Sequence, residues 1–361
     1  MKMRINLRNI ISFVTLLFLL QTITGQEIYD PPKLSHPDSW SVILIPDTQT
    51  YAKFKRNQGI LELMTGWVRE NIEPLNIKMV LCTGDLVEQN ELLVPDHING
   101  NEPSRNQWQA VSRAFEKLDG HVPYILAAGN HDFGYKNIEN RSSNYNDYFP
   151  AHRNILNQNG LRAAAYNVHG KPTLENATIE LTSPQQRKFL FMNLEFAPRD
   201  TILDWAINEV DKNRYKDHTV VVLTHSYLNA KNEHITSENY PITDGNYGKA
   251  IWDKLVAPSK NIQMVISGHI GAPDNFKAHT AFKTDINTGG KKVSQLTFNA
   301  QAMGGGWHGN GGDGWLRILE FLPDEKTVRV ITFSPYFALS PVINNMAYKR
   351  EPYQDFSFVL D

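Results

Sequence analysis

Short apolar runs that end in polar residues recur along the chain and predict buried strands. Five of these runs are continuous and rich in β-branched and aliphatic residues, which is typical of strands covered on both faces of a sheet. They lie at residues 41–45, 77–82, 122–128, 219–223 and 262–266. The sequence therefore predicts a sheet whose strands have little contact with solvent.

Between these runs, apolar residues recur at helical spacing. The pattern predicts a helix at 60–72, which Pro74 ends, and a helix at 104–118, where Ser104 and Gln107 form a capping box. The alternation of strand and helix in the first part of the chain implies a parallel sheet with helices on its faces. Two further helices are expected near residues 202–210 and 247–256.

The last part of the chain has a different pattern. Strand candidates follow one another there without convincing helices between them, which predicts a mainly antiparallel second sheet at 278–335 that faces the first. No break in composition separates two domains, so residues 41–361 are predicted to form a single domain after an extended, proline-rich lead-in at 26–40. Shorter strand candidates lie in the middle of the chain, at 163–168, 176–181 and 189–194.

The N-terminal residues have the pattern of a secretory signal. Three basic residues precede an apolar run at 10–20, which is followed by polar residues and the small residue Gly25. The run is too short to span a membrane, and because it is apolar all round, an amphipathic N-terminal helix is the weaker interpretation. We therefore expect residues 1–25 to be a signal peptide and the protein to be secreted or periplasmic, without a lipid-anchor cysteine.

Composition and charge narrow the function classes. The chain has 361 residues, 41% of them hydrophobic and 20% charged, which is ordinary for a soluble globular protein with a sizeable core. It has no basic block, which argues against nucleic acid as a partner, and no apolar segment after the N-terminal run is long enough to span a membrane. The single cysteine, Cys82, excludes an intramolecular disulfide. The oligomeric state is left open.

The residues that follow the five buried strands carry the candidate chemistry. Carboxyl ends of parallel strands meet at one edge of a sheet, so these side chains are expected to face a shared crevice. They are carboxylates, carboxamides and imidazoles without a nearby thiolate, a set that suits Mn, Fe or Zn. The candidates are Asp47 and Gln49, Asp85, Asn130 and His131, His225, and His269.

In this order and context, the motifs resemble those of the calcineurin-like metallophosphoesterases. The resemblance covers about residues 41–271 and implies a fold of two facing mixed β-sheets flanked by helices, an α/β (α+β) sandwich. It also implies two metal ions, Mn, Fe or Zn, and a phosphoester substrate. The motifs are Asp47-Thr48-Gln49, Gly84-Asp85, Gly129-Asn130-His131-Asp132, His225 and Gly268-His269-Ile270-Gly271.

The resemblance also implies a role for each candidate residue. Asp85 would bridge the two metals, and His131 would be the acid that protonates the leaving oxygen or stabilises the transition state. Two close cations would activate a water for attack on phosphorus. One metal would be completed by Asn130, His225 and His269, and the other by Asp47 and Gln49.

Two positions depart from the family pattern, and both fall on the same metal. Gln49 stands where the family usually has histidine, and Gly271 stands where it has the final histidine. We therefore expect one well-made metal site and one weakened site, a combination that resembles a subgroup of the family. His279 or Asp274 is a possible replacement for the ligand missing at Gly271.

Two hypotheses follow from these patterns. The first is an exported metal-dependent hydrolase of small-molecule or polymer-linked phosphoesters, with the choice between monoesters and diesters left open. The second is a metal-binding module of the same fold with weak or no catalysis, as the two departures suggest. In either case the glycine-rich segment at 304–314 is expected to form a rim near the metals, where Trp307 or His308 would contact the substrate.

Overall fold

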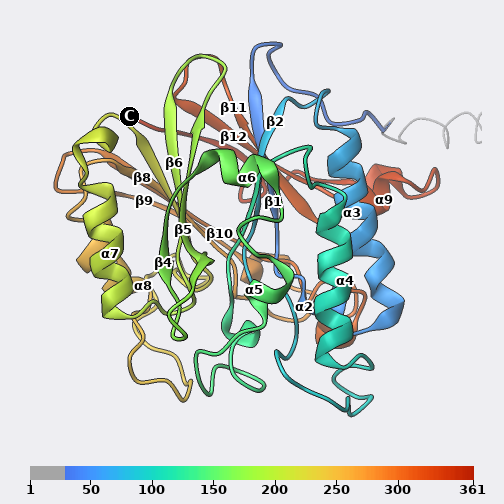
Figure 1. Ribbon diagram of the computed structural model, residues 1–361. Helices are drawn as coiled ribbons and strands as arrows, with labels where there is room; N and C mark the ends of the chain where they lie inside the picture. The colour runs from blue at the N-terminus through green and yellow to red at the C-terminus, as the bar shows by residue number, and fades with distance from the viewer. Residues whose placement is uncertain (1–28) are drawn as a thin grey trace, which may run out of the picture.

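Two mixed β-sheets of seven strands each face one another, and helices cover their outer faces (Figure 1). The computed structural model describes residues 29–361, so the predicted signal peptide and the first residues of the lead-in lie outside the described part of the chain. The predicted sandwich of two facing mixed sheets flanked by helices is confirmed.

The first sheet has a parallel half and an antiparallel half. Its order is β13-β12-β11-β1-β2-β3, and β14 also pairs with β12. The strands β1, β2 and β3 are parallel, whereas the pairs on the other side of β1 are antiparallel. The bounds are β1 Trp40–Ile45, β2 Ile77–Cys82, β3 Tyr124–Leu126, β11 Leu316–Phe321, β12 Thr327–Phe333, β13 Tyr348–Lys349 and β14 Asp355–Val359.

The second sheet has parallel strands in its centre and antiparallel strands at its edges. Its order is β4-β5-β6-β7-β8-β10-β9, and the run from β6 to β10 is parallel. The bounds are β4 Leu161–Tyr166, β5 Pro172–Thr182, β6 Lys188–Asn193, β7 Thr219–Leu223, β8 Ile262–Ser267, β9 Thr280–Ile286 and β10 Lys292–Phe298.

The prediction of a separate antiparallel sheet at 278–335 is wrong. β9 and β10 extend the second sheet, while β11 and β12 extend the first, where β11 lies antiparallel to β1. The five predicted parallel strands are likewise divided, three in the first sheet and two in the second. β1 is buried along its whole length, so its backbone needs a hydrogen-bonding neighbour on each edge. β2 pairs with one edge and β11 with the other, which places β11 in the first sheet.

The longer helices cover opposite faces of the molecule (Figure 1). α3 and α4 lie outside the first sheet, with the short α9 near α3, and α7 and α8 lie outside the second. In the described residues, 29–361, no helix is long and apolar enough to cross a membrane. The bounds are α2 Gln49–Ala52, α3 Gln58–Glu70, α4 Ser104–Glu116, α5 Tyr145–Tyr148, α6 Ile155–Gly160, α7 Asp200–Val210, α8 Gly248–Ile251, a π-helical turn Trp252–Val256, and α9 Pro335–Ala338.

The predicted capping box at the start of α4 is also wrong. Pro103 occupies the N-cap position, and no side chain caps the helix. Ser104 instead donates its hydroxyl hydrogen bond to the carbonyl of Gln89, and Gln107 accepts one from the backbone N–H of Glu88. The two side chains therefore fasten α4 to the loop that follows β2, a tertiary role that the local sequence pattern does not reveal.

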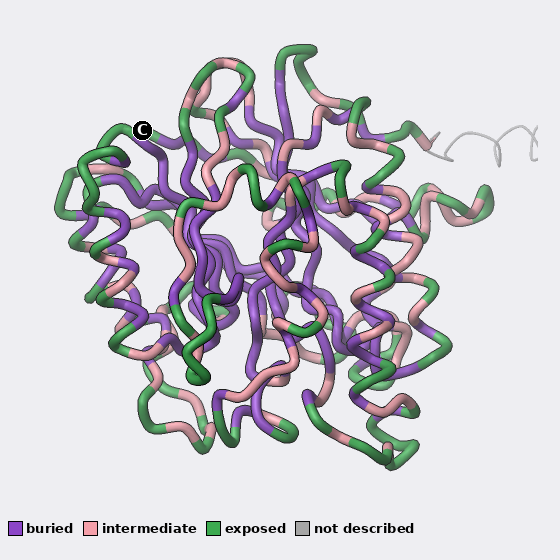
Figure 2. Tube along the Cα trace, in the orientation of Figure 1, coloured by how far each residue is buried: buried purple, intermediate pink, exposed green. Residues whose placement is uncertain are grey.

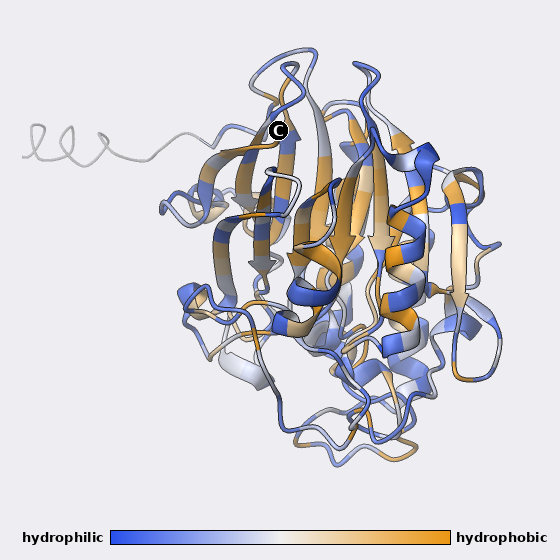
Figure 3. Ribbon diagram, turned by 90° about the vertical axis from the view of Figure 1, so that its left-hand side faces the viewer, coloured by the Kyte–Doolittle hydropathy of each residue, from blue (hydrophilic) through white to orange (hydrophobic). Residues whose placement is uncertain are grey.

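Alternation along the strands divides the interior into three apolar clusters. In β1, Val42 and Leu44 point into the space between the two sheets, whereas Ile43 and Ile45 point toward α3 and α4. A third cluster lies between the second sheet and α7. The buried trace follows the strands in Figure 2, and apolar residues concentrate on the same strands in Figure 3. The sheets are therefore a rigid support for the loops at their ends.

Candidate metal centre

The residues that follow five parallel strands gather at one end of the two sheets. Asp47, Asp85 and the motif at 129–132 follow β1, β2 and β3 in the first sheet. His225 and His269 follow β7 and β8 in the second sheet. The loops after these strands lie together at the lower end of the molecule in Figure 1. The predicted crevice therefore exists, but it lies between the edges of two sheets rather than along one.

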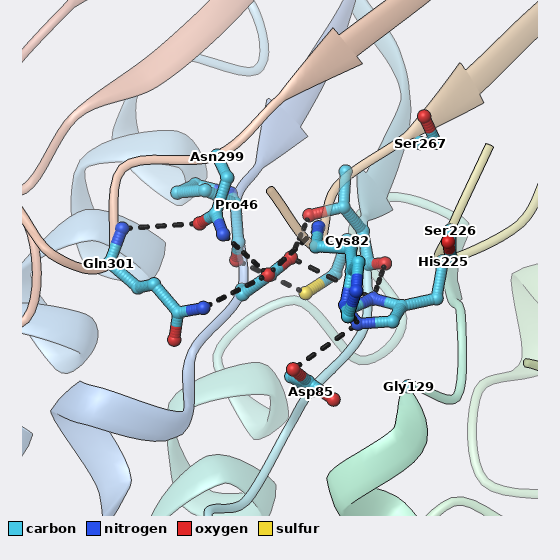
Figure 4. Close-up of polar contacts among 12 residues, drawn as sticks. Pro46, Cys82, Asp85, Gly129, His225, Ser226, Ser267, Asn299 and Gln301 are labelled. Carbon is cyan, nitrogen blue, oxygen red and sulfur yellow. Dashed lines mark hydrogen bonds and ion pairs between the residues drawn. The ribbon is translucent and has the colours of Figure 1, made fainter. Parts of the chain in front are cut away.

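Asp85, His225 and His269 are close enough to share one ion. Each offers a ligand atom, and these three atoms lie within 4.8 Å of one another. His225 Nε2 is 3.2 Å from Asp85 Oδ2, and His269 Nδ1 is 3.1 Å from His225 Nε2. Figure 4 shows His225 and Asp85 directed toward one another. Carboxylate and imidazole ligands at this spacing are suited to Zn, Mn or Fe.

The other ring nitrogen of each histidine is held by a hydrogen bond. His225 Nδ1 lies 2.8 Å from the carbonyl oxygen of Thr83, so it carries the proton and leaves Nε2 free as a ligand. His269 Nε2 lies 2.8 Å from Glu238 Oε2, which leaves Nδ1 facing His225. Hydrogen bonds of this kind fix the ring orientation of metal-binding histidines. The two imidazoles are therefore already oriented for a common ion.

Asp47 is completely buried beside this group and is held by four donors. The Thr83 hydroxyl donates to Oδ1 at 2.7 Å, and Asn299 Nδ2 donates to Oδ2 at 2.6 Å. The backbone N–H of His269 donates to Oδ2 at 3.0 Å, and Gln301 Nε2 does so at 3.4 Å. These contacts join the first sheet to the second and fix the carboxylate at the site.

Burial and close charges alter the protonation of the site. Burial raises the pKa of Asp47 to about 6, even though His225 acts in the opposite direction. Burial disfavours the charged form of His225, but the Asp85 and Asp47 carboxylates outweigh it and raise that pKa to about 10. Burial also acts against ionisation of Asp85, yet the histidines His225 and His131 hold the pKa of this carboxyl well below its usual range. Binding of a cation would therefore release a proton from His225 and keep both carboxylates ionised.

Two carboxamides at the site have buried oxygens without a partner. Asn130 Nδ2 donates to Asn137 Oδ1 at 2.6 Å, and Gln49 Nε2 lies 3.3 Å from Glu88 Oε2. Their oxygens, Oδ1 and Oε1, are buried and accept no hydrogen bond from the residues that the structure describes. An unpaired buried acceptor is unfavourable, and a cation removes this cost. Both side chains therefore fit a metal site.

His131 has one ring nitrogen fixed and the other available. Its Nδ1 is 2.7 Å from the carbonyl oxygen of Glu88, and its backbone N–H donates to Asp85 Oδ1 at 3.1 Å. Burial lowers the pKa of this imidazole, but the Asp85 and Glu88 carboxylates outweigh burial and raise it. The charged, proton-donating form is favoured, as an acid requires.

The remaining residues of the Gly-Asn-His-Asp motif shape the site. Asp132 accepts the backbone N–H groups of Leu86 at 3.0 Å, Val87 at 3.0 Å and Gly129 at 2.8 Å, which ties the loops after β2 and β3 together. A Cβ atom at Gly129 would overlap with the backbone nitrogen and the carboxylate of Asp85. Glycine is therefore required for Asp85 to approach this loop.

The candidate site opens into a cavity of about 410 Å³. Its wall includes Lys53, whose ammonium lies 3.1 Å from Glu88 Oε2, and Tyr240 from the long loop after β7. Trp307 and His308 also line it, so the predicted location of the glycine-rich segment at the rim of the site is confirmed.

Some residues of the site escaped the sequence analysis. Asn299 and Gln301 follow β10 just as the predicted ligands follow their strands, so the same strand-end pattern could have found them. Glu238 lies in a long polar loop, where no local pattern marks it. Thr83 acts through its hydroxyl and its carbonyl, and its place before Gly84-Asp85 is the only available sign.

The sandwich fold and the cluster of aspartate and histidine side chains are those of the metallophosphoesterase class of proteins. A family model described as calcineurin-like phosphoesterase matches residues 41–273. The chain therefore belongs to the calcineurin-like phosphoesterases, as its motifs predicted, and has a candidate metal site at Asp85, His225 and His269.

Among curated proteins, the chain is similar to the uncharacterized protein YvnB of Bacillus subtilis (strain 168). The two are 27% identical over 330 residues, which cover 90% of this chain and 22% of YvnB. This chain therefore spans about a fifth of the length of that relative.

The structure of this chain is similar to two solved structures, among others. One is GAP50, described as the anchor in the inner membrane complex of Plasmodium, and the other is PhoD. The match to GAP50 covers 90% of this chain and 89% of that chain, with 12% identity and a TM-score of 0.43. The match to PhoD covers 90% and 74%, with 9% identity and a TM-score of 0.44.

Removing the carboxylate of Glu238 is expected to weaken metal binding without unfolding the protein. Glu238→Gln loses the charge that orients His269, and changes of this kind typically cost roughly 10–100-fold in metal affinity. The measurement is Zn²⁺ titration of metal-free protein by calorimetry. Glu233→Gln is the matched control, because Glu233 lies on the same loop but is exposed and contacts Asn229. Equal Zn²⁺ affinity in both variants would show that Glu238 does not support the site.

Proposed function

We propose that this protein is a metal-dependent hydrolase of phosphoesters. One observation carries the proposal, the convergence of Asp85, His225 and His269 at ligand distance beside a cavity that Asp85, His269 and His131 line. Membership of the calcineurin-like phosphoesterases supports it.

The residues of the site divide into two candidate metal positions that share Asp85. The first would be held by His225, His269 and Asn130, and the second by Asp47 and Gln49. When bound, two close divalent cations lower the pKa of water and neutralise charge on a phosphoryl group during in-line displacement.

The protein's own side chains supply the remaining steps. The Glu88 carbonyl fixes Nδ1 of His131, so Nε2 would hold the proton that passes to the leaving oxygen. The side chain of Lys53 is almost fully buried at the cavity wall, and its ammonium group would attract the phosphate of the substrate into the cavity. No covalent nucleophile is needed in this scheme. Cys82 is not a candidate, because burial raises the pKa of its thiol far above its usual value.

The location and substrate of the protein are part of the proposal. The apolar run at 10–20 and its basic flank support export, either secretion or a periplasmic location. A cavity of about 410 Å³ is in the range of small-molecule sites, so we propose a small-molecule phosphoester or the phosphoester end of a polymer.

A second candidate function is a metal-binding module with weak or no catalysis. The observation that favours it is the loss of two histidine ligands from one position, where Gln49 and Gly271 stand. Such a protein would bind one ion tightly and hydrolyse neither monoesters nor diesters.

A panel of phosphate monoesters and diesters, assayed with Mn, Fe, Zn and Mg in turn, tests both functions. Two metal equivalents per chain together with hydrolysis of at least one ester class are the result that the hydrolase predicts. One tight equivalent and no turnover, even at high Mn concentration, would favour the binding module and overturn the hydrolase. The metal content should be measured on the same samples by mass spectrometry.

A further inference from the structure

The space left by the missing side chain of Gly271 is filled by His279. A Cβ atom on residue 271 would lie 2.5 Å from Nδ1 and 3.0 Å from Nε2 of the His279 ring, and closer still to its Cε1. A histidine at position 271 therefore cannot coexist with His279 in its present place. The lack of a side chain at position 271 and the packing of His279 therefore depend on one another.

Neither replacement suggested by the sequence lines the metal cavity. His279 is fully buried, its Nε2 lies 3.1 Å from the Ala272 carbonyl oxygen, and it is absent from the cavity wall. Asp274 is exposed and accepts the backbone N–H of Gly305 at 2.9 Å, so it anchors the glycine-rich segment. The second metal position therefore needs a ligand from elsewhere.

Gln301 lies where such a ligand is needed. It is only 2% exposed, and it lines the same cavity as Gln49 and Asp85. Its Nε2 lies 3.4 Å from Asp47 Oδ2, and because a carboxylate only accepts hydrogen bonds, the nitrogen is the atom that faces Asp47. Figure 4 shows Gln301 and His225 reaching the site from opposite sides.

The oxygen of Gln301 is buried and has no partner among the described residues. The same arrangement occurs in Gln49 and Asn130, whose nitrogens are hydrogen-bonded while their oxygens are unpaired. A glutamine that served only to support Asp47 would have no reason to leave a buried acceptor unpaired at the wall of the cavity. Its backbone is fixed as well, because the N–H of Gln301 donates to Asn299 Oδ1 at 3.1 Å.

We propose that Gln301 supplies, through Oε1, the ligand that Gly271 lacks, and that the second metal position consequently has only oxygen ligands. This inference rests on the metal site of the proposed function. A position built from Asp47, Asp85 and the oxygens of two glutamines suits a hard ion such as Mn²⁺ or Mg²⁺. The first position has two imidazoles and suits Zn²⁺ or Fe. The protein would therefore hold two different metals.

The test is a Mn²⁺ titration of protein that already carries one equivalent of Zn²⁺. Bound and free Mn²⁺ are distinguished by electron paramagnetic resonance, which does not depend on activity. Wild type is expected to bind one further Mn²⁺, and Gln301→Leu to bind it at least about tenfold more weakly while its Zn²⁺ content stays unchanged. Gln301→Glu keeps the size of the side chain, adds a charge and is expected to bind Mn²⁺ more tightly.

Gln263→Leu is the matched control, because Gln263 is equally buried but lies in β8 and does not line the cavity. Unchanged Mn²⁺ affinity in folded Gln301→Leu overturns the inference. If that variant does not fold, weaker or equal Mn²⁺ binding by Gln301→Glu overturns it instead. A wild-type protein that binds Zn²⁺ but no Mn²⁺ refutes the second position alone, whereas one that binds neither ion refutes the proposed function as well.

Discussion

Replacing Asp85 by asparagine is expected to remove tight metal binding and to lower turnover of an aryl phosphate ester by roughly three orders of magnitude or more. Asp85 is the carboxylate nearest to His225, and it also accepts the backbone N–H of His131. It is almost completely buried, and it also lines the cavity. Both metal positions would lose the ligand that they share.

Asparagine is a better test of this role than alanine. Asp85 has a φ angle of 42°, a left-handed conformation that asparagine adopts more readily than alanine. Asp85→Asn therefore removes the charge without adding backbone strain. Asp274→Asn is the matched control, because Asp274 also has a positive φ angle, of 51°, but does not line the cavity. Normal metal content and turnover in purified Asp85→Asn would refute the proposed centre.

Replacing His131 by glutamine is expected to lower kcat by roughly 10²–10⁴-fold while leaving the metal content unchanged. The imidazole is positioned as an acid by the Glu88 carbonyl. Burial lowers its pKa, but the carboxylates around it, Asp85 above all, outweigh burial and raise the pKa. The measurement is kcat for a series of esters whose leaving groups differ in pKa.

The dependence on the leaving group separates an acid from a residue that only positions the substrate. Esters with good leaving groups need little protonation, so the defect of His131→Gln should be small for them and large for alkyl esters. His152→Gln, a change at an exposed histidine, should have no effect on either series. An equal loss for all leaving groups would contradict the role as an acid, and a loss of metal would place His131 in the metal centre.

Gln49 and Gly271, the two departures from the family pattern, have different structural roles. Gln49 keeps its place at the cavity wall and presents a buried, unpaired oxygen, as a ligand would. Gly271 has no such function, because His279 occupies the space of its side chain. Under the proposed assignment, the weakened site that the sequence indicated would be a site with a different set of donors, and its metal preference is the property to measure.

Local patterns were sufficient for the strands and for most of the candidate ligands. β1, β2, β7 and β8 lie within a residue or two of the predicted ranges. The reason is that parallel strands covered on both faces consist of continuous apolar runs, so the length of the run gives the length of the strand. The polar residues after them follow from the same logic, since a buried parallel strand must end where the chain meets solvent or a ligand.

Strand pairing and the contacts of long loops could not be predicted in this way. The sequence at 278–333 specifies four strands but contains no information on which edge each one joins, because backbone hydrogen bonds are the same for any partner. Ser104 and Gln107 satisfy the local rule for a capping box, yet both bind the loop after β2. Hydrogen bonds to the backbone of Glu88 and Gln89 therefore take the place of the local capping bonds within α4.

The sequence by itself determined the family, the class of fold and the order of the candidate ligands along the chain, because these depend on residue type and on periodicity over a few residues. Only the tertiary structure decided that the candidate ligands meet between two sheets, that Glu238 contacts His269, and that Gln301 faces Asp47. These contacts join residues 31 and 254 positions apart, and their geometry is set by the packing of both sheets rather than by any local pattern.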